Sequence, residues 1–195
     1  INHFYKITKK NIADEPASKR RRTIKSTAES ISQVPTRQLP ESSSAQLSLQ
    51  LFKPVKPMLA KACKNYERIS YNSLLTELKY DGERIQIHKK NKSFRYFSRN
   101  LRDFSVHKLS DLEPFILKAC SKAETIILDA EILLVDTHTH KPLPFGSLNK
   151  YKKKKYPNAQ TCVYVFDILY LNGENVCMKP LGERRSLIES TLVPI

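Results

Sequence analysis

The segment LLTELKYDGERIQIH (residues 74–88) places two strand-like stretches, Leu74–Tyr80 and Arg84–His88, on either side of Asp81-Gly82. An Asp-Gly pair between two strands is a hairpin signal. The pattern predicts that Lys79 lies at the end of the first strand, just before a tight turn. From spacing alone, Lys79 is either an ordinary edge-strand lysine or a reactive amine, and the rest of the chain has to decide between them.

Three more strands and two helices are expected after this segment. Strand-like patterns cover Phe94–Ser98, Ile126–Val135 and Cys162–Leu171. Helical spacing relates Leu109, Leu112, Ile116 and Ala119, and Pro180 opens a second helical stretch with Leu181, Leu187 and Ile188. Strands that follow one another through short turns favour an antiparallel sheet. The predicted fold class is α+β, with largely antiparallel strands and helices packed on them.

The composition divides the chain near residue 52. Residues 1–52 are rich in Ser, Thr, Lys and Arg and lack hydrophobic periodicity, so they are expected to form a flexible basic tail or interdomain linker. Residues 53–195 are expected to form the folded domain. Within the tail, Lys19–Arg22 resembles a nuclear-import signal, and short basic runs of this kind are also common in disordered segments. The start at Ile1 and the end at Ile195 suggest a fragment of a longer protein.

Positive charge dominates the chain. Its 34 Lys and Arg against 19 Asp and Glu give a net charge of +15, which favours a polyanionic partner, above all nucleic acid. A solvated basic surface without a specific ligand is the alternative. Four lysines, residues 152–155, stand between Tyr151 and Tyr156, where they suit contact with a DNA backbone or simply form a solvated loop. His138 and His140 are expected in an exposed turn.

The strand Ile126–Val135 carries two acids on one face. Side chains alternate along a strand, so Asp129 and Glu131 project together with Ile127 and Leu133. Such a pair is costly on an apolar face unless it meets a metal ion, a ligand hydroxyl or a basic side chain. A metal-and-ribose site would satisfy both acids. The alternative is an ion pair with a neighbouring arginine, Arg84 or Arg99.

The strand Cys162–Leu171 carries aromatic side chains. If the strand is unbroken, period two places four side chains on the face opposite Val165 and Asp167: Tyr164, Phe166, Ile168 and Tyr170. An aromatic ring here is usually part of the core, but it could also stack on a nucleotide base.

Together these segments resemble the ATP-dependent DNA ligases of the ligase and capping-enzyme superfamily. Residues 77–84 look like motif I, 97–100 like motif Ia, 128–131 like motif III and 166–167 like motif IIIa, in the family's order and spacing. The flanking segments Pro54–Ala60 and Lys141–Gly146 look most similar to eukaryotic DNA ligase III. The resemblance covers roughly residues 53–195 and implies the incomplete adenylation domain of such an enzyme.

The resemblance implies that Lys79 attacks the α-phosphate of ATP and becomes a lysyl-adenylate. AMP then passes to the 5′-phosphate of a nick in duplex DNA, and the 3′-hydroxyl displaces it. The amine must lose its proton before it can attack. The matched positions receive these family roles: Glu77 beside adenine, Arg84 and Arg99 toward ribose and phosphates, Glu131 on the ribose hydroxyl and Mg²⁺, and Phe166 stacked on adenine. Asp81 is either a turn residue or a partner of Lys79.

The sequence departs from the family in what it lacks. Motifs IV and V, the OB-fold and the N-terminal DNA-binding domain have no match in these 195 residues. We therefore expect that this polypeptide alone does not seal nicks and adenylates itself poorly. The expected partners are nicked duplex DNA and a repair scaffold protein bound through domains outside this sequence. The expected setting is DNA repair, recombination or replication in the nucleus, with the mitochondrion as a second location.

Two other readings use the same residues. An mRNA capping guanylyltransferase or an RNA ligase shares the Lys-x-Asp-Gly nucleophile, and a preference for GTP would identify the capping enzyme. A non-catalytic nucleic-acid-binding or scaffold protein derived from a ligase is the alternative from a different class.

Overall fold

The computed structural model describes residues 5–8, 49–65, 75–104, 109, 111–148, 156–193 and 195. By its contacts the chain divides into one compact unit made of Ile1–Lys10 and Leu49–Ile195, and a second made of Asn11–Ser48. The second unit, with the basic run Lys19–Arg22, lies outside the described residues, and so do lysines 152–155. In the part of the chain that is described, no helix is long and apolar enough to cross a lipid bilayer.

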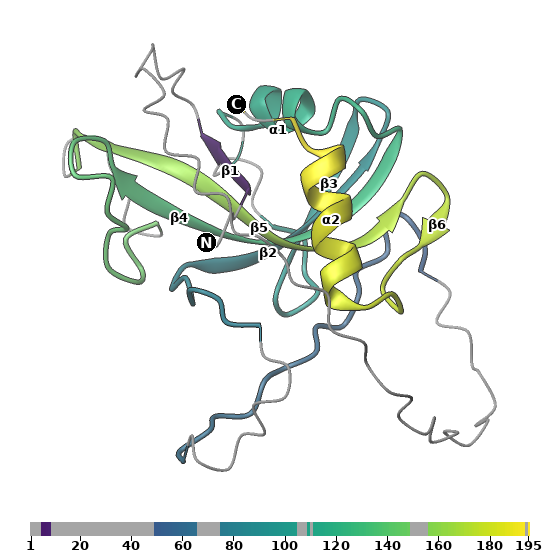
Figure 1. Cartoon of the computed structure of the whole chain (residues 1–195). Helices are drawn as coiled ribbons and strands as arrows, with labels where there is room; N and C mark the ends of the chain where they lie inside the picture. The colour runs from purple at the N-terminus through teal and green to yellow at the C-terminus, as the bar shows by residue number, and fades with distance from the viewer. Residues whose placement is uncertain are drawn as a thin grey trace, which may run out of the picture. The chain divides into compact units, whose positions relative to one another are not determined.

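The first unit is built on one antiparallel sheet (Figure 1). Its described strands follow the order β1-β5-β4-β2-β3, and β6 pairs with the end of β5. All of these neighbours run antiparallel. This confirms the predicted fold class. The strands are β1 (Tyr5–Thr8), β2 (Glu83–Lys90), β3 (Ser93–Ser98), β4 (Thr125–Asp136), β5 (Ala159–Leu171) and β6 (Glu174–Asn175), and the helices are α1 (Glu113–Ala119) and α2 (Leu181–Thr191).

The main core lies between one face of the sheet and the two helices. Every second residue of β4 faces this core, as the period of a strand requires. The four residues predicted from helical spacing, Leu109 to Ala119, are all buried there, although α1 itself begins at Glu113. Pro180 stands at the start of α2 as predicted, and α2 packs against β5 (Figure 1). The opposite face of the sheet is therefore left for the acidic side chains of β4.

Strand β5 contains two bulges that the sequence did not predict. Its pairing with β4 skips Leu169 and Phe166, so each is an extra residue in the strand. The shift moves Ile168 into the main core beside Val165. The prediction that Ile168 shares a face with Tyr164 is therefore wrong, because alternation holds only while pairing is unbroken.

Two predicted segments differ in the structure. Residues 75–80, expected as a strand, form no regular structure, and strand β2 begins at Glu83. Within residues 1–52, expected as a flexible tail, β1 pairs with β5, and Phe52 bonds to β2. Edge pairing with β5 gives β1 the backbone partners that its composition alone does not suggest. The rest of the tail lies outside the described residues, so the domain boundary near residue 52 stays a prediction.

Candidate active site

Tyr80 fixes the loop that carries Lys79. Its ring stacks on Tyr164 of β5, with ring centroids 4.2 Å apart and planes inclined by 24°. Tyr164 belongs to a small apolar cluster with Leu133 and Cys162 on the outer face of the sheet, opposite the main core. The loop is thus held by a side chain packed on the sheet rather than by strand pairing. Because neighbouring side chains of an extended loop point in different directions, the packing of Tyr80 leaves the Lys79 side chain exposed.

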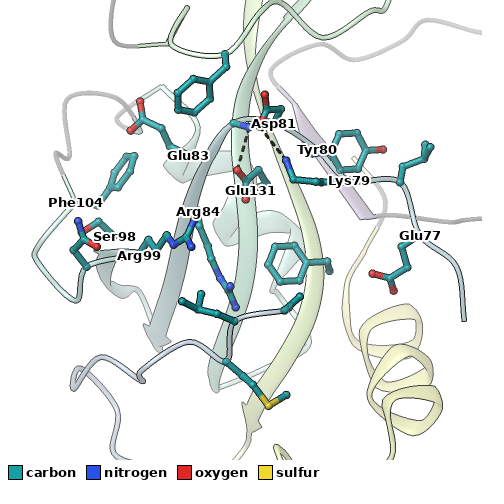
Figure 2. A pocket seen from close by; sticks show the side chains of 18 residues that line it. Glu77, Lys79, Tyr80, Asp81, Glu83, Arg84, Ser98, Arg99, Phe104 and Glu131 are labelled. Carbon is teal, nitrogen blue, oxygen red and sulfur yellow. Dashed lines mark hydrogen bonds and ion pairs between the residues drawn. The ribbon is translucent and has the colours of Figure 1, made fainter. Parts of the chain in front are cut away.

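Gly82 brings the loop directly against β4. A Cβ atom at this position would lie 2.4 Å from the carbonyl oxygen of Ile132, which only glycine avoids. The Gly82 amide donates a hydrogen bond of 3.0 Å to Oε1 of Glu131 (Figure 2). The Asp-Gly pair is therefore needed for a close crossing of two backbones. The predicted hairpin turn is wrong, since no strand precedes Gly82 among the described residues 75–81.

A cavity of about 900 Å³ opens beside this loop. It is lined by the motif I loop, the start of β2, the turn after β3, and single residues of β4 and β5. Figure 2 shows the charged side chains that line it. All six residues predicted for the site line this one cavity: Glu77, Lys79, Arg84, Arg99, Glu131 and Phe166.

Lys79 stands at the open side of the cavity. Its Nζ lies 3.0 Å from Oδ1 of Asp81, and the two side chains are 84% and 70% exposed. Asp81 is therefore a partner of Lys79, which settles the choice left open by the sequence. Lys79 is exposed, but it lines the same cavity as Glu131 and Phe166 and is not remote from them.

Arg84 and Asp129 form a two-pronged ion pair under the cavity. The arginine Nε and one Nη donate to the two carboxylate oxygens at 2.9 and 2.6 Å. Burial raises the pKa of Asp129, and the Arg84 guanidinium acts in the opposite direction. This confirms the alternative in which Asp129 pairs with Arg84. The same guanidinium lies 5.4 Å from the centre of the Phe166 ring, so it also supports the aromatic wall.

Of the two acids on this face of β4, Glu131 is the one that lines the cavity. Burial raises the pKa of its carboxyl group, while the Gly82 amide, Arg84 and Lys79 lower it. Within the described residues no group of three or more His, Cys, Asp or Glu side chains gathers as a metal site. Mg²⁺ often takes only one or two protein carboxylates and completes its shell with phosphates and water. A single carboxylate at Glu131 fits that mode of binding.

Helix α2 contributes two contacts that the sequence did not predict. Arg184 pairs with Asp167 of β5 through bonds of 2.7 and 3.1 Å. The next residue, Arg185, forms an ion pair with Glu77. Figure 2 shows Glu77 turned toward this helix. Nothing in the spacing of the motifs signalled these arginines, because both acids lie far from them in sequence.

Sequence reasoning also missed part of the cavity wall. Met58, Leu59 and Ala60 line it, together with Phe104 and Phe145. The first three fall in the segment Pro54–Ala60, whose likeness to a ligase segment was the one available signal. His138 and His140 lie in an exposed turn, as predicted, and the carboxylate of Asp136 accepts bonds from the turn's amides.

The chain that forms this cavity is similar in sequence to known proteins. Residues 57–195 match the ATP dependent DNA ligase domain. The chain is 46% identical over 150 residues to a DNA ligase of Fowlpox virus (strain NVSL), covering 75% of this chain and 27% of that protein. It is also 46% identical over 154 residues to DNA ligase 3 of Dictyostelium discoideum, covering 78% of this chain and 13% of that protein. The chain thus spans about a quarter or less of these relatives.

Among solved structures, a mycobacterial DNA ligase D complexed with ATP and MES is similar at 21% identity and a TM-score of 0.49, over 60% of this chain and 36% of that chain. The family match includes every segment that lines the cavity, from Met58 to Phe166. On that match, this chain belongs to the family of ATP dependent DNA ligase domains.

Proposed function

We propose that the cavity binds ATP and that Lys79 accepts AMP from it, as the first step of nick sealing in duplex DNA. The observation that carries the proposal is that one cavity gathers an amine, a half-buried acid and an aromatic ring: Lys79, Glu131 and Phe166. Each of these suits one part of a nucleotide: the phosphate, the ribose hydroxyls and the base.

The roles follow the chemistry of the side chains. Phe166 stacks on adenine from its bulge, and Glu77 lies beside the base. Glu131 accepts from a ribose hydroxyl and would hold Mg²⁺, which when bound neutralises phosphate charge. Arg84 and Arg99 face the ribose and phosphates. The Arg84 guanidinium already donates two hydrogen bonds to Asp129, so it acts with that acid as a fixed pair.

The proposed reaction consists of three transfers. The Lys79 amine forms a bond to the α-phosphorus, pyrophosphate leaves with its bonding electrons, and the amine gives up a proton. A 5′-phosphate oxygen of nicked DNA then displaces Lys79 and takes the AMP. In the last transfer the neighbouring 3′-hydroxyl loses its proton, attacks the 5′-phosphorus and expels AMP. Each transfer depends on positioning and charge neutralisation more than on acid-base chemistry.

The 195-residue polypeptide is expected to perform the first transfer poorly. It holds no match to motifs IV and V, which in the family add an acid and phosphate-gripping lysines. Lys79 itself is exposed and paired with Asp81. We expect ATP to bind without stoichiometric covalent labelling.

The test separates binding from chemistry. Titration with a fluorescent ATP analogue should show saturable binding that ATP displaces better than GTP. Phe166→Ala should weaken it by about tenfold or more, since stacking on an aromatic ring contributes about 1–3 kcal/mol per base. Lys92→Ala, an exposed lysine outside the cavity, serves as control. Absence of binding, or equal binding by the Phe166 variant, contradicts the proposal.

The covalent step is followed with ATP labelled at the α-phosphate, in the presence of Mg²⁺. Any label retained on denatured protein should disappear in Lys79→Ala and persist in Lys92→Ala. Stoichiometric label on wild type would contradict the expected weak chemistry. Label that survives in Lys79→Ala would remove Lys79 as the nucleophile.

We also propose that the chain lies near DNA ligase III, on its segments Pro54–Ala60 and Lys141–Gly146. Overall identity does not distinguish the two, because it is the same to the viral ligase and to Dictyostelium DNA ligase 3. The proposed setting is repair, recombination or replication of nuclear DNA, with a mitochondrial form and a scaffold partner as extensions. A fluorescent fusion should lose nuclear accumulation when Lys19–Arg22 are replaced by alanine.

A further inference from the structure

The segment before the motif I loop is tied to the sheet by a side chain that imitates a strand. Gln86 of β2 points away from the main core, and its Oε1 accepts a hydrogen bond of 2.9 Å from the Val55 amide. Its Nε2 donates to the carbonyl oxygen of the same residue. One amide side chain thus satisfies both backbone groups of Val55, as a neighbouring strand would.

A second tie lies two residues along the same face of β2. Nδ1 of His88 accepts a bond of 3.1 Å from the Phe52 amide. The imidazole packs edge-on against Phe97 of β3, with ring centroids 4.9 Å apart at 80°. Gln86 and His88 are 3% and 0% exposed, so the segment covers both polar side chains. A buried polar group without a partner costs free energy, which ties the segment and these residues together.

The tied segment continues into the cavity wall. Met58, Leu59 and Ala60 line the cavity. Met58 and Leu59 are 93% and 59% exposed, so packing in the core does not hold them. Their place is set by the anchor at Val55, which lies three residues before Met58 and therefore at most about 11 Å from it. Pro54 and Pro57 restrict the backbone on both sides of Val55 and reduce its slack.

We propose that Gln86 is a positioning residue for nucleotide binding: through Val55 it holds the Met58–Ala60 wall at the cavity that takes ATP. This inference rests on the proposed function. It assigns Gln86 no contact with nucleotide; its effect passes through the backbone of Val55. Removing the two bonds lets the wall move, and the binding-competent population falls.

The test changes each side of the tie separately. Gln86→Leu removes both bonds from the sheet side, and Val55→Pro removes the amide donor from the segment side. Each should weaken binding of the fluorescent ATP analogue, by about tenfold for Gln86→Leu, from two bonds of modest net strength. Gln50→Leu, an exposed glutamine in the same segment, is the control and should bind as wild type. The variant that carries both Gln86→Leu and Val55→Pro should bind the analogue little more weakly than Gln86→Leu alone, because both changes break the same tie.

A second readout does not depend on nucleotide. Amide hydrogen exchange should be slow at Phe52 and Val55 in wild type and at least about tenfold faster at Val55 in Gln86→Leu, with β4 amides unchanged. Unchanged β4 amides also verify that the variant is folded. Fast exchange at Val55 in wild type overturns the inference whatever the chain binds. Lost protection with unchanged ATP affinity overturns it while the proposed function stands. If wild type binds no ATP, the proposed function fails and with it the inference, even where exchange shows the tie.

Discussion

At Gly82 the motif I loop crosses β4 so closely that its backbone lies against Ile132 and its amide donates to Glu131. Because the constraint is a backbone in β4, a long way off in sequence, no local pattern could reveal it. Lys79, Glu131 and Phe166 could be found from sequence because chemistry-bearing side chains recur in a recognisable order.

Gly82→Ala should therefore destabilise the fold. The added methyl group would lie 2.4 Å from the Ile132 oxygen, so the loop must move away from Glu131. Overpacking of this kind costs about 1–3 kcal/mol, and the free energy of unfolding in urea measures it. Gly182→Ala is the matched control. A Cβ atom there meets nothing within 4 Å and lies in α2, so alanine should stabilise by up to about 1 kcal/mol. Equal effects of the two changes would contradict this account of Gly82.

His88 should make stability depend on pH. Burial, with a smaller contribution from Arg95, lowers the pKa of His88 to about 4. In the unfolded chain the ring binds a proton with its ordinary pKa of about 6.5. The folded chain does not bind that proton until the pH is much lower. Stability is therefore complete above that ordinary pKa and is lost as the pH falls toward 4. The loss between about pH 7 and 5 should be on the order of 2 kcal/mol.

Urea denaturation at the two pH values tests this. His88→Gln cannot titrate and should lose less stability than wild type over the same interval. His140→Asn, a change at an exposed turn histidine with positive φ that asparagine tolerates, should behave as wild type. If His88→Gln loses as much unfolding free energy as wild type, then other groups govern the loss of stability at low pH.

At the scale of elements, β5 places Phe166 at the cavity, and α2 holds Asp167 of β5 and Glu77 of the motif I loop through two arginines. The bulges in β5 make Phe166 an unpaired residue beside the cavity and leave Asp167 facing Arg184. The positions of β2, β3, β4 and β5 and the face of β4 followed from hydrophobic periodicity, although each strand is longer than predicted, and Pro180 marked the start of α2. The bulges did not follow from periodicity, because an extra residue in one strand is defined only by its partner strand.

The two neighbouring arginines of α2 should separate stability from binding. Arg184→Met leaves Asp167 without its partner in a pair whose side chains are 16% and 20% exposed, and should cost about 1–3 kcal/mol of unfolding free energy. Arg185→Met releases Glu77, and should weaken ATP binding more than it lowers stability. Each variant is the control for the other, with denaturation and nucleotide titration measured on both. The reverse pattern would mean that Arg185 anchors the helix and Glu77 has no part in the cavity.

For the molecule as a whole, the sequence predicted the class of fold and the cavity better than the paths between elements. The residues before Asp81 were expected to form a strand, yet the motif I loop is held by the packing of Tyr80 on Tyr164. The strand β1 was hidden in a polar stretch, since backbone pairing needs no apolar pattern. The ties from Gln86 and His88 to the upstream segment were equally hidden, because side-chain to backbone bonds leave no periodic trace.

The net charge is a property of the whole chain, and it predicts how the chain meets DNA. With +15 at neutral pH, binding to duplex should come mainly from released counterions, so the logarithm of affinity should fall linearly with that of salt. The slope is about −0.9 for each phosphate neutralised, so replacing the four lysines 152–155 by glutamine should make it shallower by up to about 3.6. Fluorescence anisotropy with nicked and intact duplexes measures both quantities. Affinity should be equal for the two duplexes, because charge reads the backbone and not the break. A clear preference for the nick, or affinity that ignores salt, would mean that shaped contacts within these 195 residues, and not their charge, govern the binding.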